Sequence, residues 1–104
     1  MAISIDERRL QPRQQPEAPL YVDAALRDGT STRAQVLDWS LHGMRLLFRP
    51  TVDLEPGGAI AVSDADSDQR EPAQVQWCHH KRHFTVAGIR ASGSRFHLHL
   101  ADPA

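Results

Sequence analysis

The stretch PLYVDAALRDGTSTRAQVLDWS, residues 19–40, predicts how this chain folds. Every second residue from 20 to 26 is apolar, which is the pattern of a β-strand with one buried face. The pair Asp28-Gly29 comes next, and because glycine accepts the positive φ of a tight turn, this pair indicates a two-residue hairpin. Alternation resumes in residues 31–40. The stretch therefore predicts an antiparallel β-hairpin.

The rest of the chain repeats this arrangement of short alternating runs and turns. Further strands are expected at residues 43–50, 59–63, 73–80, 84–92 and 95–100, with turns at 55–58 and near 80–82 and an exposed acidic loop at 64–72. Leucine-rich helical patterns are missing. Such regular spacing is typical of an all-β domain, either a small antiparallel barrel or a sandwich. We expect Phe48, Val75 and Val86 in its core.

Residues 1–18 differ from the rest because they show no apolar period and are broken by prolines. They carry Arg8, Arg9 and Arg13. We expect a flexible N-terminal arm here, followed by a β-domain over residues 19–104. Two interpretations of the arginines stay open. They belong to a solvated tail, or they bind an anionic, planar ligand that orders the segment.

Composition limits the class of protein. A chain of 104 residues has room for one domain with a modest core. Its net charge of −1 argues against a nucleic-acid polymer as the partner. The single cysteine, Cys78, excludes an internal disulfide framework and fits a reducing compartment. No apolar run approaches the roughly 20 residues that span a bilayer. We therefore expect a cytoplasmic domain with no membrane attachment.

The run DWSLHG, residues 38–43, lies between two expected strands. Asp38 and Ser40 are two apart in an extended chain, which places a carboxylate and a hydroxyl on the same side. Gly43 permits a bend, or a close approach of a ligand to the backbone. By itself the run is more typical of a turn in which Asp38 or Ser40 bonds to nearby backbone.

Two short motifs stand in order within this strand pattern: Arg9-x-x-x-Arg13 in the arm and Asp38-x-Ser40-x-x-Gly43 after the second strand. In this combination nearly the whole chain resembles the PilZ domain family, whose binding signatures are RxxxR and (D/N)xSxxG. The resemblance implies a small six-stranded antiparallel β-barrel with a mobile N-terminal arm. It also implies a non-catalytic receptor for cyclic di-GMP. We expect a stand-alone adaptor, a monomer or weak dimer, that orders its arm and contacts an unidentified downstream protein.

The resemblance also implies a role for each motif residue. Arg9 and Arg13 would bind guanine and phosphate, since a guanidinium is a planar fork that pairs with either group. Asp38 would accept hydrogen bonds from guanine N1–H and the exocyclic amine. Ser40 would add a hydroxyl contact, and Gly43 would leave clearance for the ligand.

Three more residues are candidates for ligand contact. Arg8 precedes the first motif, His42 lies inside the second, and Trp77 is on a strand that approaches the ligand in the family. Trp77 alternates with Val75, however, so we expect its ring in the core. Alternation points Trp39 away from its neighbours in the motif, toward the core or its rim.

Other functions are less well supported. The run HHKRH at residues 79–83, next to Cys78, suggests a metal, but adjacent strand side chains point to opposite faces, and a solvated turn is the better interpretation. No cofactor, metal or catalytic constellation is expected. The alternative is a ligand-independent PilZ-type interaction module, for example one of pilus or motility machinery. Binding of single-stranded nucleic acid would require a basic face with exposed aromatic residues.

Overall fold

The structure, a computed structural model, describes residues 14–64, 69–93 and 95–97. The described residues form six β-strands and no helix, which confirms the all-β prediction. The strands are β1 (Tyr21–Ala25), β2 (Ser31–Trp39), β3 (Gly43–Phe48), β4 (Ala59–Asp64), β5 (Glu71–His80) and β6 (Thr85–Ala91).

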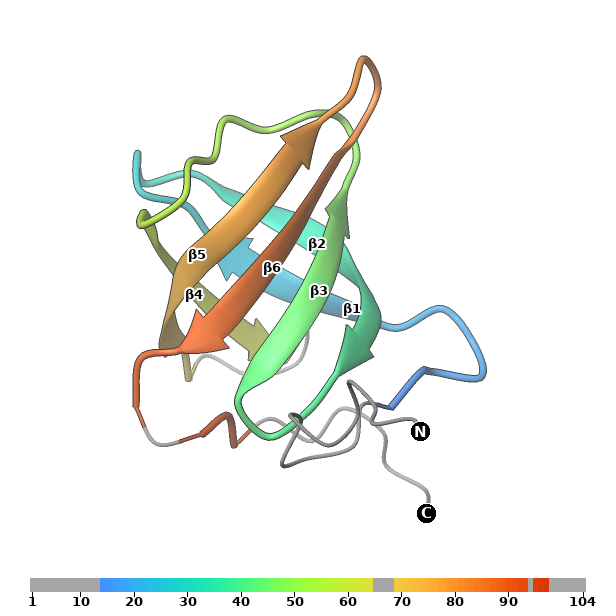
Figure 1. The fold of residues 1–104 in the computed structure, drawn as a ribbon, viewed down its shortest axis with the longest axis vertical. Helices are drawn as coiled ribbons and strands as arrows, with labels where there is room; N and C mark the ends of the chain where they lie inside the picture. Colours follow the sequence, from blue (N-terminus) through green and yellow to red (C-terminus); the bar gives the residue numbers. More distant parts are fainter. Residues whose placement is uncertain (1–13, 65–68, 94, 98–104) are drawn as a thin grey trace, which may run out of the picture.

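The six strands close into a barrel in the order β1-β2-β3-β6-β5-β4, with β4 paired back to β1. In Figure 1, β5, β6 and β3 cross the near side of the barrel, and β1 and β4 run behind them. Every pairing is antiparallel. The barrel, not the sandwich, is therefore correct, and the six-stranded architecture is confirmed.

The prediction of a seventh strand at residues 95–100 is wrong for the part of it that the structure describes. Residues 95–97 are not in a strand, and residues 98–100 lie outside the described part. The reason is closure, because a closed barrel offers no unpaired edge to another strand. Phe96 is instead 7% exposed, and its backbone N–H donates to the Leu41 carbonyl at 2.7 Å. Its segment therefore packs beside the β2–β3 turn.

The hairpin between β1 and β2 is confirmed, although its loop is longer than the two residues expected. Ala25 and Ser31 are the last paired residues, and the Leu26 N–H donates to the Thr30 carbonyl at 2.7 Å. The Gly29 N–H donates to the Leu26 carbonyl at 3.0 Å. Gly29 itself has φ of 93°, which explains why glycine is favoured here.

Inward-pointing apolar side chains fill the barrel. From the strands they are Val22, Ala24, Ala34, Val36, Met44, Leu46, Phe48, Ile60, Val62, Ala73, Val75, Ala87, Ile89 and Ala91. The core positions predicted for Phe48 and Val75 are confirmed. The prediction for Val86 is wrong, because Thr85 and Ala87 on either side take the inward positions and leave Val86 half-buried on the outer face.

Two strands, β2 and β5, contain an irregularity that decides which side chains reach the outer face. The pairing of β2 with β3 shifts between Val36 and Asp38, and that of β5 with β6 shifts between Val75 and Trp77. A β-bulge inserts one extra residue, so the residues after it change face. Both valines point into the core, whereas Asp38 and Trp77 belong to the outer face.

Candidate functional site

The turn between β2 and β3 is closed by the serine and the glycine of the DxSxxG motif. The Ser40 N–H donates to the Gly43 carbonyl at 2.8 Å, and the Gly43 N–H donates to Ser40 Oγ at 3.2 Å. Positive φ occurs at Gly29 and Gly57 among the described glycines, and Gly43 lies in the extended start of β3. The turn interpretation of Ser40 is thus correct.

Asp38 forms an ion pair with a residue that the sequence did not assign to the site. The bulge in β2 brings Asp38 opposite Arg45 of β3. Arg45 Nε donates to Asp38 Oδ2 at 2.7 Å, and Arg45 Nη2 donates to the same oxygen. The Asp38 side chain is 3% exposed and that of Arg45 is 43% exposed. The arginine therefore presents the pair to solvent while the carboxylate stays covered.

The register continues from Asp38 across three more strands. Arg45 of β3 is paired with Gly88 of β6, and Gly88 is paired with Trp77 of β5. Residues directly opposite in a sheet point to the same side. We call the residues Asp38, Arg45, Gly88 and Trp77 the outer row. It brings a carboxylate, a guanidinium and an indole to one face of the barrel.

Trp77 is not a core residue, which corrects the prediction made from its alternation with Val75. The bulge between the two residues turns the indole outward, where it is 36% exposed. Its ring covers Gly88, and a side chain at Gly88 would overlap three indole atoms. His79 lies against the same ring, with the ring centroids 5.4 Å apart. Trp39, by contrast, lies opposite Met44 and packs against the core, as predicted.

The chain before β1 runs beside the end of β2. The Gln14 N–H donates to the Trp39 carbonyl at 2.8 Å, and the Trp39 N–H donates to the Gln14 carbonyl at 3.0 Å. Gln14 is therefore fixed to the neighbour of Asp38. Arg8, Arg9 and Arg13 lie outside the described residues, so the roles expected of them stay predictions.

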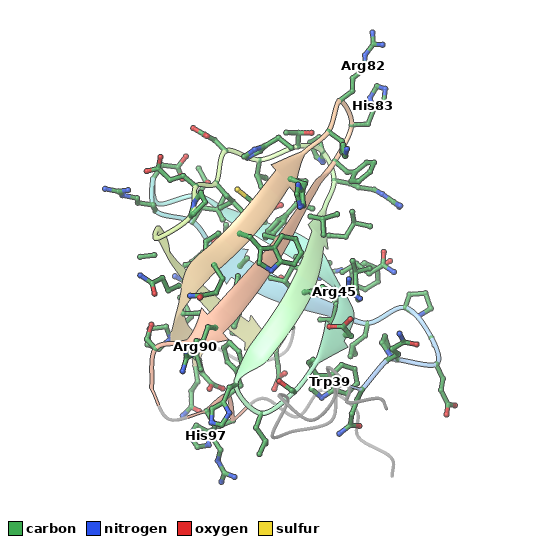
Figure 2. The ribbon with its side chains drawn as sticks, in the orientation of Figure 1. Trp39, Arg45, Arg82, His83, Arg90 and His97 are labelled. Carbon is green, nitrogen blue, oxygen red and sulfur yellow. The ribbon has the colours of Figure 1, made fainter. Side chains whose placement is uncertain are left out.

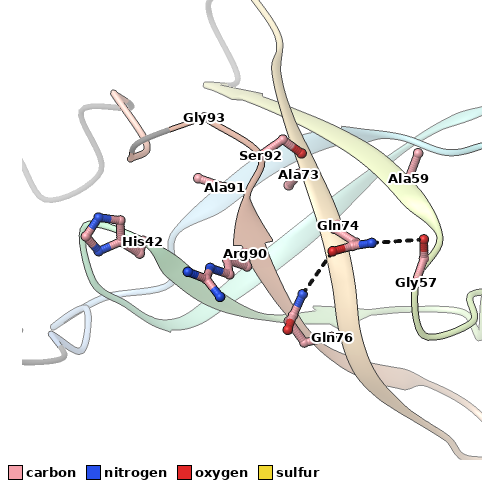
Figure 3. Close-up of a pocket in the computed structure, with 10 residues that line it drawn as sticks. All are labelled: His42, Gly57, Ala59, Ala73, Gln74, Gln76, Arg90, Ala91, Ser92 and Gly93. Carbon is pink, nitrogen blue, oxygen red and sulfur yellow. Dashed lines mark hydrogen bonds between the residues drawn. The ribbon is translucent and has the colours of Figure 1, made fainter. Parts of the chain in front are cut away.

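A second arginine that the sequence did not assign, Arg90, lies next to the motif. It is paired with Gly43 of β3 on one side and with Gln74 of β5 on the other. Together with His42 it lines a cavity of about 660 Å³ (Figure 3). Figure 2 places Arg90 toward the end of the barrel where Trp39 lies, and Arg82 at the opposite tip. Only the cross-strand register brings Arg90 to the motif, and one sequence does not supply that register.

The histidine-rich turn does not gather metal ligands within the described residues. No group of three or more His, Cys, Asp or Glu side chains there could hold a metal ion. Cys78 Sγ donates to the Leu54 carbonyl at 3.4 Å, and His80 Nε2 accepts from the Leu54 N–H at 3.4 Å. These two side chains therefore hold the loop before β4 in place.

Among the described residues there is no helix long and apolar enough to cross a membrane.

The comparison with solved structures supports the fold. No family model and no curated protein matches the sequence. The barrel is similar to the PilZ domain of YcgR from Escherichia coli with c-di-GMP, at a TM-score of 0.67 and 18% identity, over 83% of this chain and 79% of that one. It is also similar to E. coli YcgR in complex with c-di-GMP, at a TM-score of 0.60 and 23% identity, over 81% of this chain but only 38% of that one. The chain thus has the fold of a PilZ domain, as its motifs predicted.

Proposed function

We propose that this domain is a receptor for cyclic di-GMP that works by binding and not by catalysis. The observation that carries the proposal is the outer row, which aligns the motif carboxylate of Asp38, covered by Arg45, with the partly exposed indole of Trp77 on one face of the barrel. The two E. coli structures of similar fold are both described with c-di-GMP, which supports the same ligand class here.

Asp38 is the proposed guanine-binding residue. A carboxylate offers about four acceptor positions. Arg45 binds Oδ2 of this carboxylate, and we propose that guanine N1–H and the exocyclic amine donate to the carboxylate as well. The Ser40 hydroxyl still has its proton to donate, because in the turn it accepts from the Gly43 N–H. Gly43 adds clearance at the start of β3.

Trp77 is the proposed stacking partner for the second base. Adjacent strands are about 4.8 Å apart, and the indole of Trp77 reaches over Gly88, so roughly two strand spacings, ~10 Å, separate it from Asp38. One guanine cannot bridge that gap, but a ligand with two guanines can occupy both ends. A tryptophan face also stacks on a purine at about 1–3 kcal/mol per base.

The arginines of the arm are the proposed clamp. Arg13 is covalently joined to Gln14, whose backbone is bonded to Trp39, so the arm enters the barrel beside Asp38. We propose that Arg9 and Arg13 bind guanine and phosphate, with Arg8 as a third positive contact. Ordering the arm would change the surface offered to a downstream protein, and this is the proposed output of a cytoplasmic adaptor.

Isothermal titration of the purified chain with cyclic di-GMP tests the proposal, with GTP and cyclic GMP as controls. We expect saturable binding that is selective for cyclic di-GMP, and the fitted stoichiometry distinguishes one ligand from a stacked pair. Absence of both heat and thermal stabilisation at high protein concentration would reject it. A ligand-independent interaction module would then become the leading hypothesis.

A further inference from the structure

The cavity beside the β2–β3 turn has the size of a ligand site. Its volume is about 660 Å³, within the roughly 300–1,000 Å³ typical of small-molecule sites. Figure 3 shows Arg90 between His42 on one side and Gln74 and Gln76 on the other. The cavity lies over the outer faces of β5 and β6 and is bounded by the loop before β4.

The charge of the cavity favours an anion. None of the described residues that line it is acidic, and Arg90 is an exposed arginine that forms no ion pair with any described residue. Arg45, the other arginine on this face, is already paired with Asp38. The two arginines are therefore not equivalent, because among the described residues the charge of Arg45 is matched by a carboxylate and the charge of Arg90 is not.

The neutral side chains of the cavity supply additional donors. The Gln76 side-chain amide donates to Gln74 Oε1, and the Gln74 amide donates to the Gly57 carbonyl, both at 3.4 Å. Each amide has two N–H groups, so each keeps a second donor. The hydroxyl of Ser92 lies on the same wall. These groups would complete the coordination of an anion held by Arg90.

The cavity adjoins the outer row. Arg90 is two residues from Gly88 along β6, and Gly43 is two residues from Arg45 along β3, so the row Gly43–Arg90–Gln74 runs parallel to the outer row. Two residues along a strand correspond to about 7 Å. A group in the cavity can therefore belong to the same ligand as a base held at Asp38.

We propose that this cavity is an anion subsite, in which Arg90 binds a phosphate of the nucleotide ligand. The assignment rests on the proposed function for the identity of that ligand, but the subsite itself rests on the charge and donors of the cavity. A guanidinium suits a phosphate because its fork of N–H groups pairs with two phosphate oxygens at once.

The test compares Arg90→Gln with Arg82→Gln, a matched substitution at the exposed β5–β6 tip, far from the cavity (Figure 2). Thermal melting first verifies that both variants fold. Each is then titrated with cyclic di-GMP by calorimetry. We expect Arg90→Gln to weaken binding about 10-fold or more, since hydrogen bonds to charged groups are the strong ones, and Arg82→Gln to bind as the wild type does. Equal binding by Arg90→Gln would overturn the subsite and leave the receptor function intact.

A second titration applies if the wild type does not bind cyclic di-GMP. Inorganic phosphate is added while the amide signals of Gln74 and Gln76 are followed by NMR. Saturable shifts that disappear in Arg90→Gln and persist in Arg82→Gln would support the anion subsite although the proposed ligand had failed. No shift in the wild type would overturn the subsite together with the receptor function.

Discussion

Strands β2 and β5 use the same backbone device with different results. Each contains a bulge immediately after an inward valine, and each thereby sends the next functional side chain to the outer face. The carboxylate of Asp38 is covered and only 3% exposed, whereas Trp77 remains 36% exposed. The residue on the neighbouring strand makes the difference, because Asp38 meets a long arginine, and Trp77 lies over a glycine that adds no side chain.

The comparison shows that a bulge decides whether a side chain points to the inner or the outer face of the barrel. The residue opposite it on the neighbouring strand then decides what an outward side chain can bind. A carboxylate held by Arg45 is fixed in orientation, which suits hydrogen bonding to the edge of a base. An indole resting on Gly88 stays partly exposed, which suits stacking. Four substitutions, from the largest expected effect to the smallest, test this division.

The largest effect is expected at the valine before the bulge of β5. Val75→Ala removes two methyl groups from the core, where Val75 is 1% exposed, and we expect the free energy of unfolding to fall by about 2–4 kcal/mol. Val86→Ala is the matched control on the outer face, with an expected loss under about 1 kcal/mol. Urea denaturation measures both. Equal losses would contradict the assignment of faces in β5 and β6.

A methyl group at Gly88 should displace the Trp77 ring. Gly88→Ala places a Cβ on the indole, so we expect a loss of about 1–3 kcal/mol in the free energy of unfolding. In a protein that already carries Trp77→Ala, the further change Gly88→Ala should cost little stability, because the clash is then absent. Additive losses in this double-mutant cycle would mean that the ring does not rest on Gly88.

The Asp38–Arg45 pair should contribute modestly to stability. Arg45 is 43% exposed and screened by solvent, so Asp38→Asn is expected to lower the free energy of unfolding by about 1 kcal/mol and to abolish ligand binding. Asp23→Asn is the control, in an exposed pair whose Nε–Oδ1 distance to Arg33 is 3.8 Å, and should have almost no effect. A loss above about 3 kcal/mol for Asp38→Asn would contradict the solvent screening of this pair.

The smallest effect is expected at the β1–β2 loop, at the other end of β2. Thr30 donates its hydroxyl and its backbone N–H to Asp28 Oδ1, at 2.7 and 2.9 Å, and these bonds hold the pKa of the Asp28 carboxyl below its ordinary value. A carboxyl whose pKa is lowered by folding stabilises the folded protein at pH values above its ordinary pKa, which is near 4. This stabilisation is lost as the pH falls through the lowered pKa of the folded state.

The loop prediction is therefore a pH profile. The stability difference between the wild type and Asp28→Ala should be constant near neutral pH and should shrink below about pH 4. Urea denaturation across that range measures it. A difference that grows toward acid would have the wrong sign for a lowered pKa.

The sequence predicted the inner face of the barrel better than its outer face. Alternation placed Val22 and Phe48 correctly, because inward positions repeat along a single strand and need no knowledge of partners. It failed at Trp77, which is in phase with Val75 in the sequence, because a bulge is a property of two paired strands. Gly88 was the available signal, since a glycine inside a strand often marks a close approach.

The candidate site was predictable only in part, for the same reason. Asp38, Ser40 and Gly43 are close in sequence, and the structure keeps them together at one turn. Arg45 and Arg90 join them through the register of β2, β3 and β6, which no local pattern specifies. The arginines of the arm lie outside the described residues, so their contribution depends on experiment.

Tryptophan fluorescence tests the central claim most directly, namely that cyclic di-GMP lies on the outer row. The chain has two tryptophans, so Trp39→Phe leaves Trp77 as the sole reporter. We expect cyclic di-GMP to change the Trp77 emission saturably at the affinity measured by calorimetry, and Asp38→Asn in the same background to abolish the change. Calorimetric binding with no change in Trp77 emission would place the ligand elsewhere on the barrel and contradict the account.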